Sequence, residues 1–536
     1  MTDPTFPPVD LAAWRSQVEA ELGGADFEAA LTTELLEGIR VQPLYTSHGA
    51  ANRQPRSYIG NALGWFLTPR IETTDTEDAQ RQIARDLAGG ATALWLRLDQ
   101  AARSGIEADG RAEGTLAGRD GVAAYHAGDL QAVLVDVPLD EVALSLDAGA
   151  NTLPAAAALI AFMQGRNIDP GAAELHFNCD PVAALAQDGT LPTTTTSLAA
   201  EMAQLTRFCE ASARQATAIT VSDLPFHAAG ATVVDELGIA AATLATYLRW
   251  LEGAGCDPET VMPYILLRSA VDRDLFTGIA KLRALRTLWN KIASACGVTA
   301  VPAARIHAVT ADRPLTQRAP WLNMLRATGQ TLAAVTGGAD FITTAAWDRP
   351  LGRSTDDARR LARNTQTILG EESSLGKVLD PAGGSHYVEE LTDQLARKAW
   401  TFFQEIERQG GCAVALATGW LPERLEVSRA AREAAVGDGR LSITGVTDYV
   451  AEDEDRPERE LFDAEFAADH ALDRLRQHRD QRLEAPDPDR DCTDLSELIR
   501  LAGTGATLGE LSRALRRRPA DPIEPLPSFR DEEAAE

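Results

Sequence analysis

Three side chains are the candidates for acid–base chemistry in this sequence: Asp223, His227 and His307. Histidine suits that role because its ordinary pKa is the closest to neutral pH among the side chains. They are fallback candidates only, because the preferred interpretation is that the chain has no catalytic group of its own. His307 lies in an apolar stretch that predicts a strand, where an interior histidine with satisfied hydrogen bonds is the simpler interpretation.

Residue spacing gives no support for metal ligation or for the common phosphate-binding and nucleophilic motifs. No grouping of His, Asp and Glu resembles a metal site, and there is no Walker loop, GxSxG motif or Rossmann fingerprint. The six cysteines are at least 30 residues apart, so none forms a CxxC pair. Neither a zinc knot nor a disulfide framework is predicted, and a reducing cytoplasm fits this cysteine usage best.

Alternating strands and helices must position any functional residues. Eight short apolar runs predict strands: Thr92–Leu98, Val142–Asp147, Glu174–Cys179, Ala218–Asp223, Val261–Leu267, Arg305–Thr310, Phe341–Ala346 and Lys377–Leu379. Helical patterns lie between them, at Pro154–Gln164, Leu198–Ala213, Val233–Glu252, Leu275–Ala295, Trp321–Thr336 and Thr355–Leu369. Eight strands alternating with helices is the number that closes an α/β (β/α)8 TIM barrel, whose functional residues lie on loops after the strands. A doubly wound open sheet is the alternative that this pattern leaves open.

The stretch Leu361–Thr392 has the order expected of a last barrel repeat. A helix breaks at Gly370 and Gly376, the short apolar run Lys377–Leu379 follows, and a glycine-rich loop leads to a helix that starts near Tyr387. The sequence therefore predicts that Lys377–Leu379 is the eighth strand of the barrel.

The same stretch resembles the adenosylcobalamin-dependent acyl-CoA mutases, in particular methylmalonyl-CoA mutase. Those chains carry ARNTQ, EES, KVxDPxGGS and YxxExLT in this order. The matching residues here are Ala362–Gln366, Glu371–Ser373, Lys377–Ser385 and Tyr387–Thr392. The resemblance implies a barrel with an N-terminal helical arm that wraps a partner subunit.

Catalytic members of that family carry polar groups that this sequence lacks. Their loop after the fourth strand reads GYHxxEAGA; here Leu224 replaces the Tyr and Pro225 replaces the His. Val309 stands at the substrate-contacting Gln of RAHCQT, and Ala345 stands at the Asn of HTNSFDEA. Because these side chains donate no hydrogen bond, the resemblance implies a barrel that folds like the enzyme without its chemistry. His227 would substitute for the lost donors only in a shifted loop.

Cobalamin binding in that family belongs to a separate flavodoxin-like C-terminal domain, recognised by the motif DxHxxG. The motif is absent here, since Asp469-His470 continues as Ala-Leu-Asp. The resemblance therefore implies no flavodoxin-like domain and no cofactor-binding residues in this chain. Adenosylcobalamin is expected on the partner.

Among family members, the sequence looks most like the small (beta) subunit of the heterodimeric bacterial methylmalonyl-CoA mutase. That resemblance implies a non-catalytic partner of a large subunit that interconverts (R)-methylmalonyl-CoA and succinyl-CoA. Two alternatives stay open: the substrate barrel of a split mutase with a separate cobalamin protein, and a non-enzymatic acyl-CoA-binding or chaperone-like barrel. Strand register decides whether Trp95, Phe177 or Tyr264 fills the barrel channel, and sequence does not give that register.

Composition limits the partners. Lys and Arg number 51 against 79 Asp and Glu, a formal charge of −28, which argues against nucleic acid and anionic membranes. No apolar run reaches the roughly 18 to 20 residues of a membrane span, and the acidic, Pro-rich start is unlike a signal peptide. We predict a cytoplasmic protein with an arm at residues 1–50, a barrel at 51–411, a helical extension at 412–484, and a linker with an acidic tail at 485–536.

Overall fold

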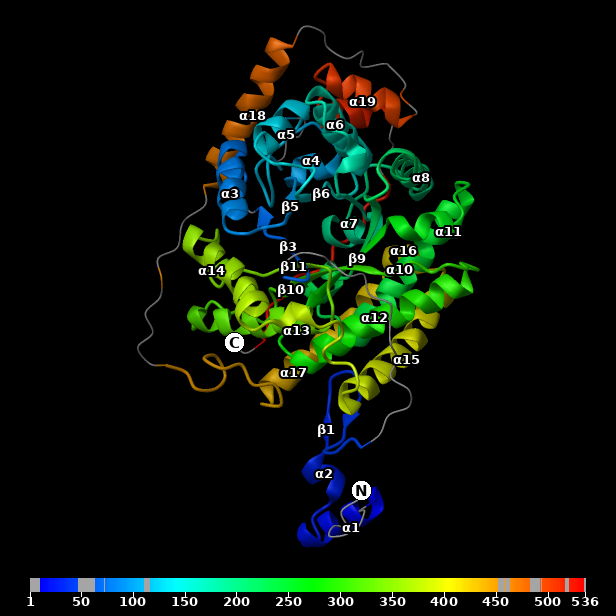
Figure 1. Cartoon of the computed structure of the whole chain (residues 1–536), viewed down its shortest axis with the longest axis vertical. Helices are drawn as coiled ribbons and strands as arrows, with labels where there is room; N and C mark the ends of the chain where they lie inside the picture. Colours follow the sequence, from blue (N-terminus) through cyan, green and yellow to red (C-terminus); the bar gives the residue numbers. More distant parts are fainter. Residues whose placement is uncertain are drawn as a thin grey trace.

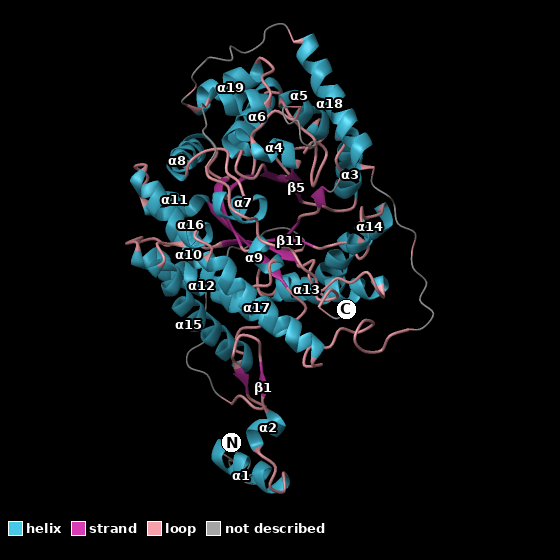
Figure 2. Ribbon diagram, turned by 180° about the vertical axis from the view of Figure 1, so that it is seen from behind, coloured by secondary structure: helices cyan, strands magenta, loops and turns pink. Residues whose placement is uncertain are grey.

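A sheet of nine parallel strands, counted over the described residues, forms the centre of the molecule (Figures 1 and 2). The computed structural model describes residues 10–46, 63–71, 73–109, 116–451, 457, 463–482, 492, 494–515 and 520–534. The strands are β3 (Phe66–Leu67), β4 (Arg70–Ile71), β5 (Ala93–Arg97), β6 (Ala143–Asp147), β7 (Leu175–Cys179), β8 (Thr217–Ser222), β9 (Ile265–Val271), β10 (Arg305–Thr310) and β11 (Phe341–Thr343). Their order in the sheet is β3-β11-β10-β9-β8-β7-β6-β5-β4.

The two edges of this sheet are halves of one extended segment. Only Thr68 and Pro69 separate β3, which pairs with β11, from β4, which pairs with β5. The Trp95 backbone N–H donates to the Pro69 carbonyl at 3.0 Å, and the Thr68 N–H donates to the Ile342 carbonyl at 2.9 Å. The sheet therefore closes on itself with eight strand positions, as the TIM-barrel prediction required, and the open sheet is excluded.

The prediction that Lys377–Leu379 forms the eighth strand is wrong. Residues 375–377 form a 3-10 turn, and Val378 and Leu379 are exposed. The segment at β3 and β4 takes that position instead; Pro69 in its middle made it look unlike a strand. Gly376 packs against the chain that enters β3, where a Cβ would lie 1.7 Å from the Leu63 carbonyl oxygen, so only glycine fits there.

A second predicted strand is displaced. Val261–Leu267 was expected, but β9 begins at Ile265, after helix α11 (Pro258–Val261) and the 3-10 turn Met262–Tyr264. Tyr264 therefore lies before the strand rather than in it. The apolar run at residues 261–267 is compatible with a strand that begins at Val261 or at Ile265. The turn at Pro263 places the start of the strand at Ile265.

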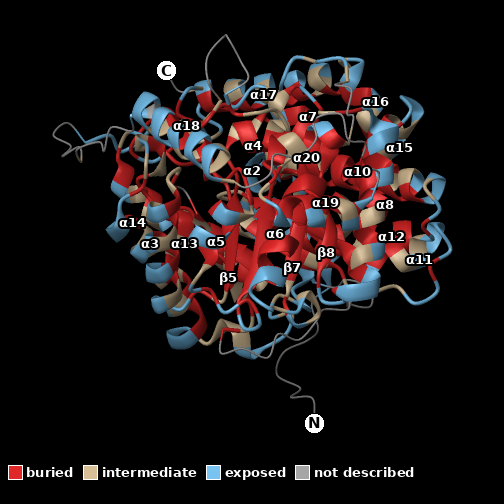
Figure 3. Cartoon of the chain, turned by 90° about the horizontal axis from the view of Figure 1, so that it is seen from above, coloured by how far each residue is buried: buried red, intermediate tan, exposed pale blue. Residues whose placement is uncertain are grey.

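Helices surround the barrel and bury their inner faces against it, while their outer faces are exposed (Figure 3). They are α3 (Thr76–Ala88), α4 (Gln100–Ser104), α5 (Ala127–Leu134), α6 (Thr152–Gly165), α7 (Pro181–Asp188), α8 (Thr195–Ser212), α9 (Leu224–Ala228), α10 (Val233–Gly253), α12 (Leu275–Ala295), α13 (Asn323–Thr336), α14 (Asp356–Thr367) and α15 (His386–Arg408). Polar caps define several starts. Thr232 and Asp235 form a capping box on α10, and the Asp274 side chain accepts the Thr277 N–H on α12.

An N-terminal arm stands away from the barrel (Figure 1). It contains α1 (Leu11–Glu21), α2 (Phe27–Leu31) and the antiparallel pair β1 (Thr33–Glu34) and β2 (Arg40–Val41). No residue of α1 is buried: Leu11 is exposed, and Trp14 meets the Phe27 ring of α2 edge-on at 6.1 Å. Among the described residues none buries this helix, which leaves it available for contact with another molecule.

The C-terminal helices pack back on the barrel. They are α16 (Cys412–Ala417), α17 (Trp420–Gly437), α18 (Ala464–Gln481), α19 (Leu495–Gly503) and α20 (Leu508–Ala514), and α19 lies against α6. The His478 ring of α18 stacks on His126 at 3.5 Å. The predicted linker and acidic tail at 485–536 are described in part: residues 485–491 lie outside the described residues, whereas residues 520–534 cross the barrel mouth. Among the described helices, none combines the length and apolar character needed to cross a bilayer.

Candidate functional site

A cavity of about 420 Å³ lies at the carboxyl ends of the barrel strands, and we call it the mouth cavity. Four residues line it for which the family resemblance implies a missing polar group: Leu224, Pro225, Val309 and Ala345. His227 lines it as well. Residues up to about 120 apart in sequence are therefore gathered in one place, which is the usual place for function in this fold.

Below the mouth cavity, aromatic rings fill the lower barrel. Phe66 of β3 stacks on Phe341 of β11 with ring centroids 4.7 Å apart, and His176 of β7 meets Phe341 edge-on at 4.7 Å. Ala93, Ala143 and Leu266 complete this layer. All of these side chains are inward residues of their strands, spaced by two from the layer above.

The middle layer is organised by Arg268 of β9, which is 5% exposed. Its Nη2 donates to Asn178 Oδ1 at 2.6 Å, and its guanidinium lies 4.5 Å from the centroid of the Trp95 indole. Arg268 Nε donates to His307 Nδ1 at 3.3 Å, so the other nitrogen of His307 donates to Thr343 Oγ1 at 2.8 Å. Trp95 and Arg268 line the floor of the mouth cavity.

These contacts keep His307 neutral. Burial lowers the pKa of His307 well below its ordinary value, and the Arg268 charge lowers it further. Both ring nitrogens have partners and the side chain is 1% exposed, so His307 has no free atom to offer a substrate.

Paired charges form the upper layer. Arg97 Nη1 donates to Asp147 Oδ2 at 2.9 Å, and Asp120 lies 3.1 Å from both Arg97 and Arg103. Burial would raise the pKa of Asp147, but Arg97 and Arg268 outweigh it and hold that pKa below its usual range. These carboxylates stay ionised and hold their arginines in place.

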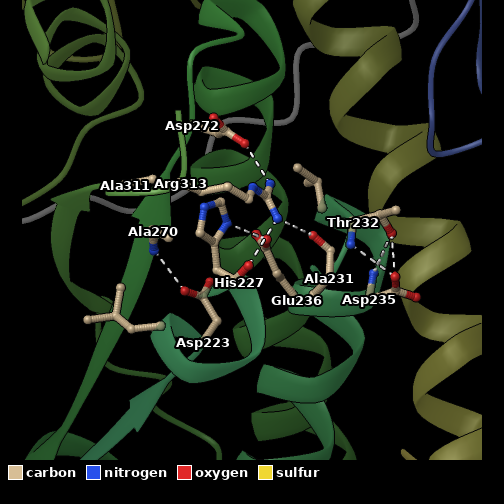
Figure 4. A network of polar contacts seen from close by, with 12 residues as sticks. Asp223, His227, Ala231, Thr232, Asp235, Glu236, Ala270, Asp272, Ala311 and Arg313 are labelled. Carbon is tan, nitrogen blue, oxygen red and sulfur yellow. Dashed lines mark hydrogen bonds and ion pairs between the residues drawn. The ribbon is translucent and has the colours of Figure 1, made fainter. Parts of the chain in front are cut away.

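The predicted pair Asp223 and His227 belongs to a buried ion network (Figure 4). Nδ1 of His227 lies 2.7 Å from Glu236 Oε1, and Lys281 connects Glu236 to Asp223, whose Oδ2 is 2.8 Å from Lys281 Nζ. Asp223 also accepts the Ser269 hydroxyl at 2.6 Å. The structure therefore brings Asp223 and His227 together through two residues from α10 and α12.

The charges in this network are matched. Burial would raise the pKa of Glu236, but Lys281 and His227 lower it to about 2. Burial would lower the pKa of Lys281, but Asp223 and Glu236 raise it. Arg313 extends the network, because it donates to the His227 carbonyl at 3.0 Å and pairs with Asp272 at 2.6 Å (Figure 4). A carboxylate–histidine pair is the composition of a general base, yet here its carboxylate also neutralises a buried ammonium.

Sequence reasoning missed Arg268, Glu236 and Lys281. A signal was present for Arg268, because a single charge interrupts the apolar strand ILLRSAV at residues 265–271. Of the three aromatic residues considered for the channel, Trp95 points inward, whereas Phe177 points outward to Phe208 at 6.3 Å. Among the described residues, no group of three His, Cys, Asp or Glu side chains is placed to hold a metal ion.

Comparison with known proteins gives a matching family and several relatives. The family model described as "Methylmalonyl-CoA mutase" matches residues 38–520. The methylmalonyl-CoA mutase small subunit of Streptomyces virginiae is 37% identical over 505 residues, covering 90% of this chain and 78% of that relative. The small subunit of Propionibacterium freudenreichii subsp. shermanii is 31% identical, covering 83% of this chain and 69% of the relative. The methylmalonyl-CoA mutase of Escherichia coli K12 is 28% identical, covering 94% and 74%.

Proposed function

Since this chain belongs to the methylmalonyl-CoA mutase family, we propose that it is the non-catalytic small subunit of a heterodimeric mutase. Its large partner isomerises (R)-methylmalonyl-CoA and succinyl-CoA by a radical route. One observation carries the proposal: Leu224, Pro225, Val309 and Ala345 converge on the mouth cavity, where a catalytic barrel needs polar donors.

The chemistry explains why those four residues matter. A rearranging acyl group needs a donor at its thioester carbonyl and another at its free carboxylate, both fixed before the reaction. Apolar side chains and a proline supply neither. The arginines near the cavity floor are already held by carboxylates, as Arg97 is by Asp147, so their charges are not available without breaking buried pairs.

The barrel interior supports the same proposal. A CoA chain that followed the barrel axis would have to pass the layer of Trp95 and Arg268 and then the stacked rings of Phe66 and Phe341. Protein interiors are close-packed, so a ligand would enter this layer only by displacing side chains. We therefore assign substrate binding to the partner.

The family depends on adenosylcobalamin, and the residues present here do not fit that cofactor. Besides the barrel, the sheet that the described residues form is the small β1–β2 pair, so they contain no flavodoxin-like sheet. The chain also lacks the DxHxxG motif. We assign the cofactor to the partner and derive no step through it.

The test compares this chain alone, the large subunit alone and the mixture, each with adenosylcobalamin and (R)-methylmalonyl-CoA. We expect no succinyl-CoA from this chain alone and a stable complex in the mixture by size-exclusion chromatography. Turnover by the isolated chain would refute the proposal. Turnover only after adding a separate DxHxxG protein would favour the split mutase instead.

An acyl-CoA-binding barrel is the second candidate, because a cavity of about 420 Å³ is present and is bordered by arginines. Titration calorimetry of the isolated chain with methylmalonyl-CoA and with free CoA separates the two functions. We expect no binding heat at micromolar ligand since the axis is filled. Saturable heat with the thioester would favour the binding function.

A further inference from the structure

Residues 520–534 run across the barrel mouth as an extended segment, which we call the strap. Five of its N–H groups donate to carbonyls along the rim, beginning with Ala520, which donates to Leu191 at 3.3 Å. Ile523 donates to Gly189 at 2.8 Å and Leu526 donates to Ala186 at 2.8 Å, both at the end of α7. Phe529 donates to Ala228 of α9 at 3.1 Å, and Asp531 donates to Arg313 at 3.1 Å. The strap thus follows the rim from the loop after β7 to the loop after β10.

One end of the strap is anchored by buried charge. The Asp531 side chain is fully buried and accepts two hydrogen bonds from Arg432 of α17, at 2.6 and 2.8 Å. Glu532 is 6% exposed and accepts the backbone N–H groups of Gln317 and Arg318 at 2.6 and 2.9 Å. Bidentate and charge-assisted bonds of this kind are the strong ones, so this end is a fixed attachment.

The anchor is continuous with the network beneath it. Arg432 also lies 3.3 Å from Asp272, the carboxylate that pairs with Arg313. Arg313 in turn donates to the His227 carbonyl. The attachment of the strap and the wall of the mouth cavity therefore share the same buried charges.

The middle of the strap forms a roof. Residues Leu526 to Arg530 line the mouth cavity from above, opposite Trp95 and Arg268 on its floor. Phe529 is buried, and it passes so close to Gly230 that a Cβ there would lie 2.9 Å from the Phe529 ring. The strap extends beyond residue 520, where the match to the family ends.

We propose that the strap is a releasable lid, an internal contact that keeps solutes out of the mouth cavity while the Asp531 and Glu532 anchor is made. Its rim bonds are few and peripheral, and its strong bonds are concentrated at one end. Breaking the anchor frees the roof as a unit and opens the cavity. This inference does not depend on the identity of the partner subunit.

The test places a cysteine under the roof, with Ala345→Cys, and measures its modification by N-ethylmaleimide in the full chain by peptide mass spectrometry. The exposed native Cys296 is the internal reference. We expect slow modification at position 345 and an acceleration of about 10- to 100-fold when Asp531→Ala removes the charged anchor bonds. Glu524→Gln, at an exposed carboxylate of the strap away from the anchor, is the matched control and should leave the rate unchanged.

A second measurement guards against a variant that misfolds. Amide hydrogen exchange of the unmodified chain should show protected amides at Leu526 and Phe529, and Asp531→Ala should lose that protection while α12 keeps its own. Equal modification rates at position 345 with and without the anchor would overturn the proposal. So would exchange of the strap amides at free-peptide rates in the unmodified chain.

Discussion

Lys281→Met removes one positive charge from between two buried carboxylates. The Lys281 ammonium lies 2.8 Å from Asp223, contacts Glu236, and donates to the Ala270 carbonyl at 2.7 Å. Lys281 is 2% exposed, so water does not replace the lost charge. Methionine keeps the length and apolar packing of the lysine stem, so the substitution reports mainly on charge.

The expected cost follows from the pKa of Glu236. Burial alone would raise that pKa, yet Lys281 and His227 lower it from 4.5 to about 2. At about 1.36 kcal/mol per unit, this difference corresponds to roughly 3 kcal/mol of preference for the ionised form. Removing one partner of a buried ion pair costs about 3–5 kcal/mol, and we expect a loss of that size in the free energy of unfolding near pH 7.

The pH dependence separates this effect from lost packing. Because the folded pKa of Glu236 lies below its unfolded value, its stabilisation is present above pH 4.5 and is lost as the pH falls toward 2. Without Lys281, burial raises that pKa, so Glu236 takes up a proton at a higher pH. The penalty of Lys281→Met should therefore shrink on acidification.

The assay is urea unfolding followed by circular dichroism at pH 7.5 and pH 5. Lys398→Met, at an exposed lysine of α15, is the matched control and should change stability by less than about 0.5 kcal/mol. The reasoning fails if Lys281→Met costs less than about 1 kcal/mol at pH 7.5, or if its cost is the same at both pH values.

Three further outcomes are expected. Burial lowers the pKa of His126 to about 4, below its unfolded value, so the protein loses stability as the pH falls from 6.5 to 4. The urea midpoint of His126→Asn should therefore fall less steeply between pH 7 and pH 5 than that of the unmodified chain, and an equal fall would contradict this. Gly376→Ala should yield little folded protein because its Cβ meets the Leu63 carbonyl, whereas Gly329→Ala, with open space around it, should fold normally; equal yields would be the contrary result. Leu11→Glu on the exposed face of α1 should leave the isolated chain as stable as before but weaken co-purification with the large subunit, and undiminished capture would argue against an arm contact.

Local patterns in the sequence determined most of the element order. The apolar spacing of α12 predicted Leu275–Ala295, and the structure has these bounds. The strand over Arg305–Thr310 was likewise predicted with its observed ends. Amphipathic spacing, caps and β-branched runs act over a few residues, so one chain carries enough information for them. The hypothesis that polar groups are missing at Leu224 and Val309 likewise rests on a local departure from a family motif.

Only the tertiary structure decided what those elements enclose. Strand register put Trp95 inside the barrel and Phe177 outside, which a period of two does not reveal by itself. Barrel closure gave the eighth position to the segment at β3 and β4 rather than to Lys377–Leu379. The sequence pattern favoured Lys377–Leu379, but the energy that chose between the two segments comes from pairing with strands far along the chain.

The same distinction applies to the site. Glu236 and Lys281 are 45 residues apart, and Arg432 and Asp531 are 99 residues apart, so no local pattern relates their charges. Each pair is stable only because folding buries it, and burial depends on every element that covers it. The sequence by itself determined the family and led to the hypothesis of missing donors. The filled axis, the matched charges beneath the mouth and the strap above it are consequences of long-range packing.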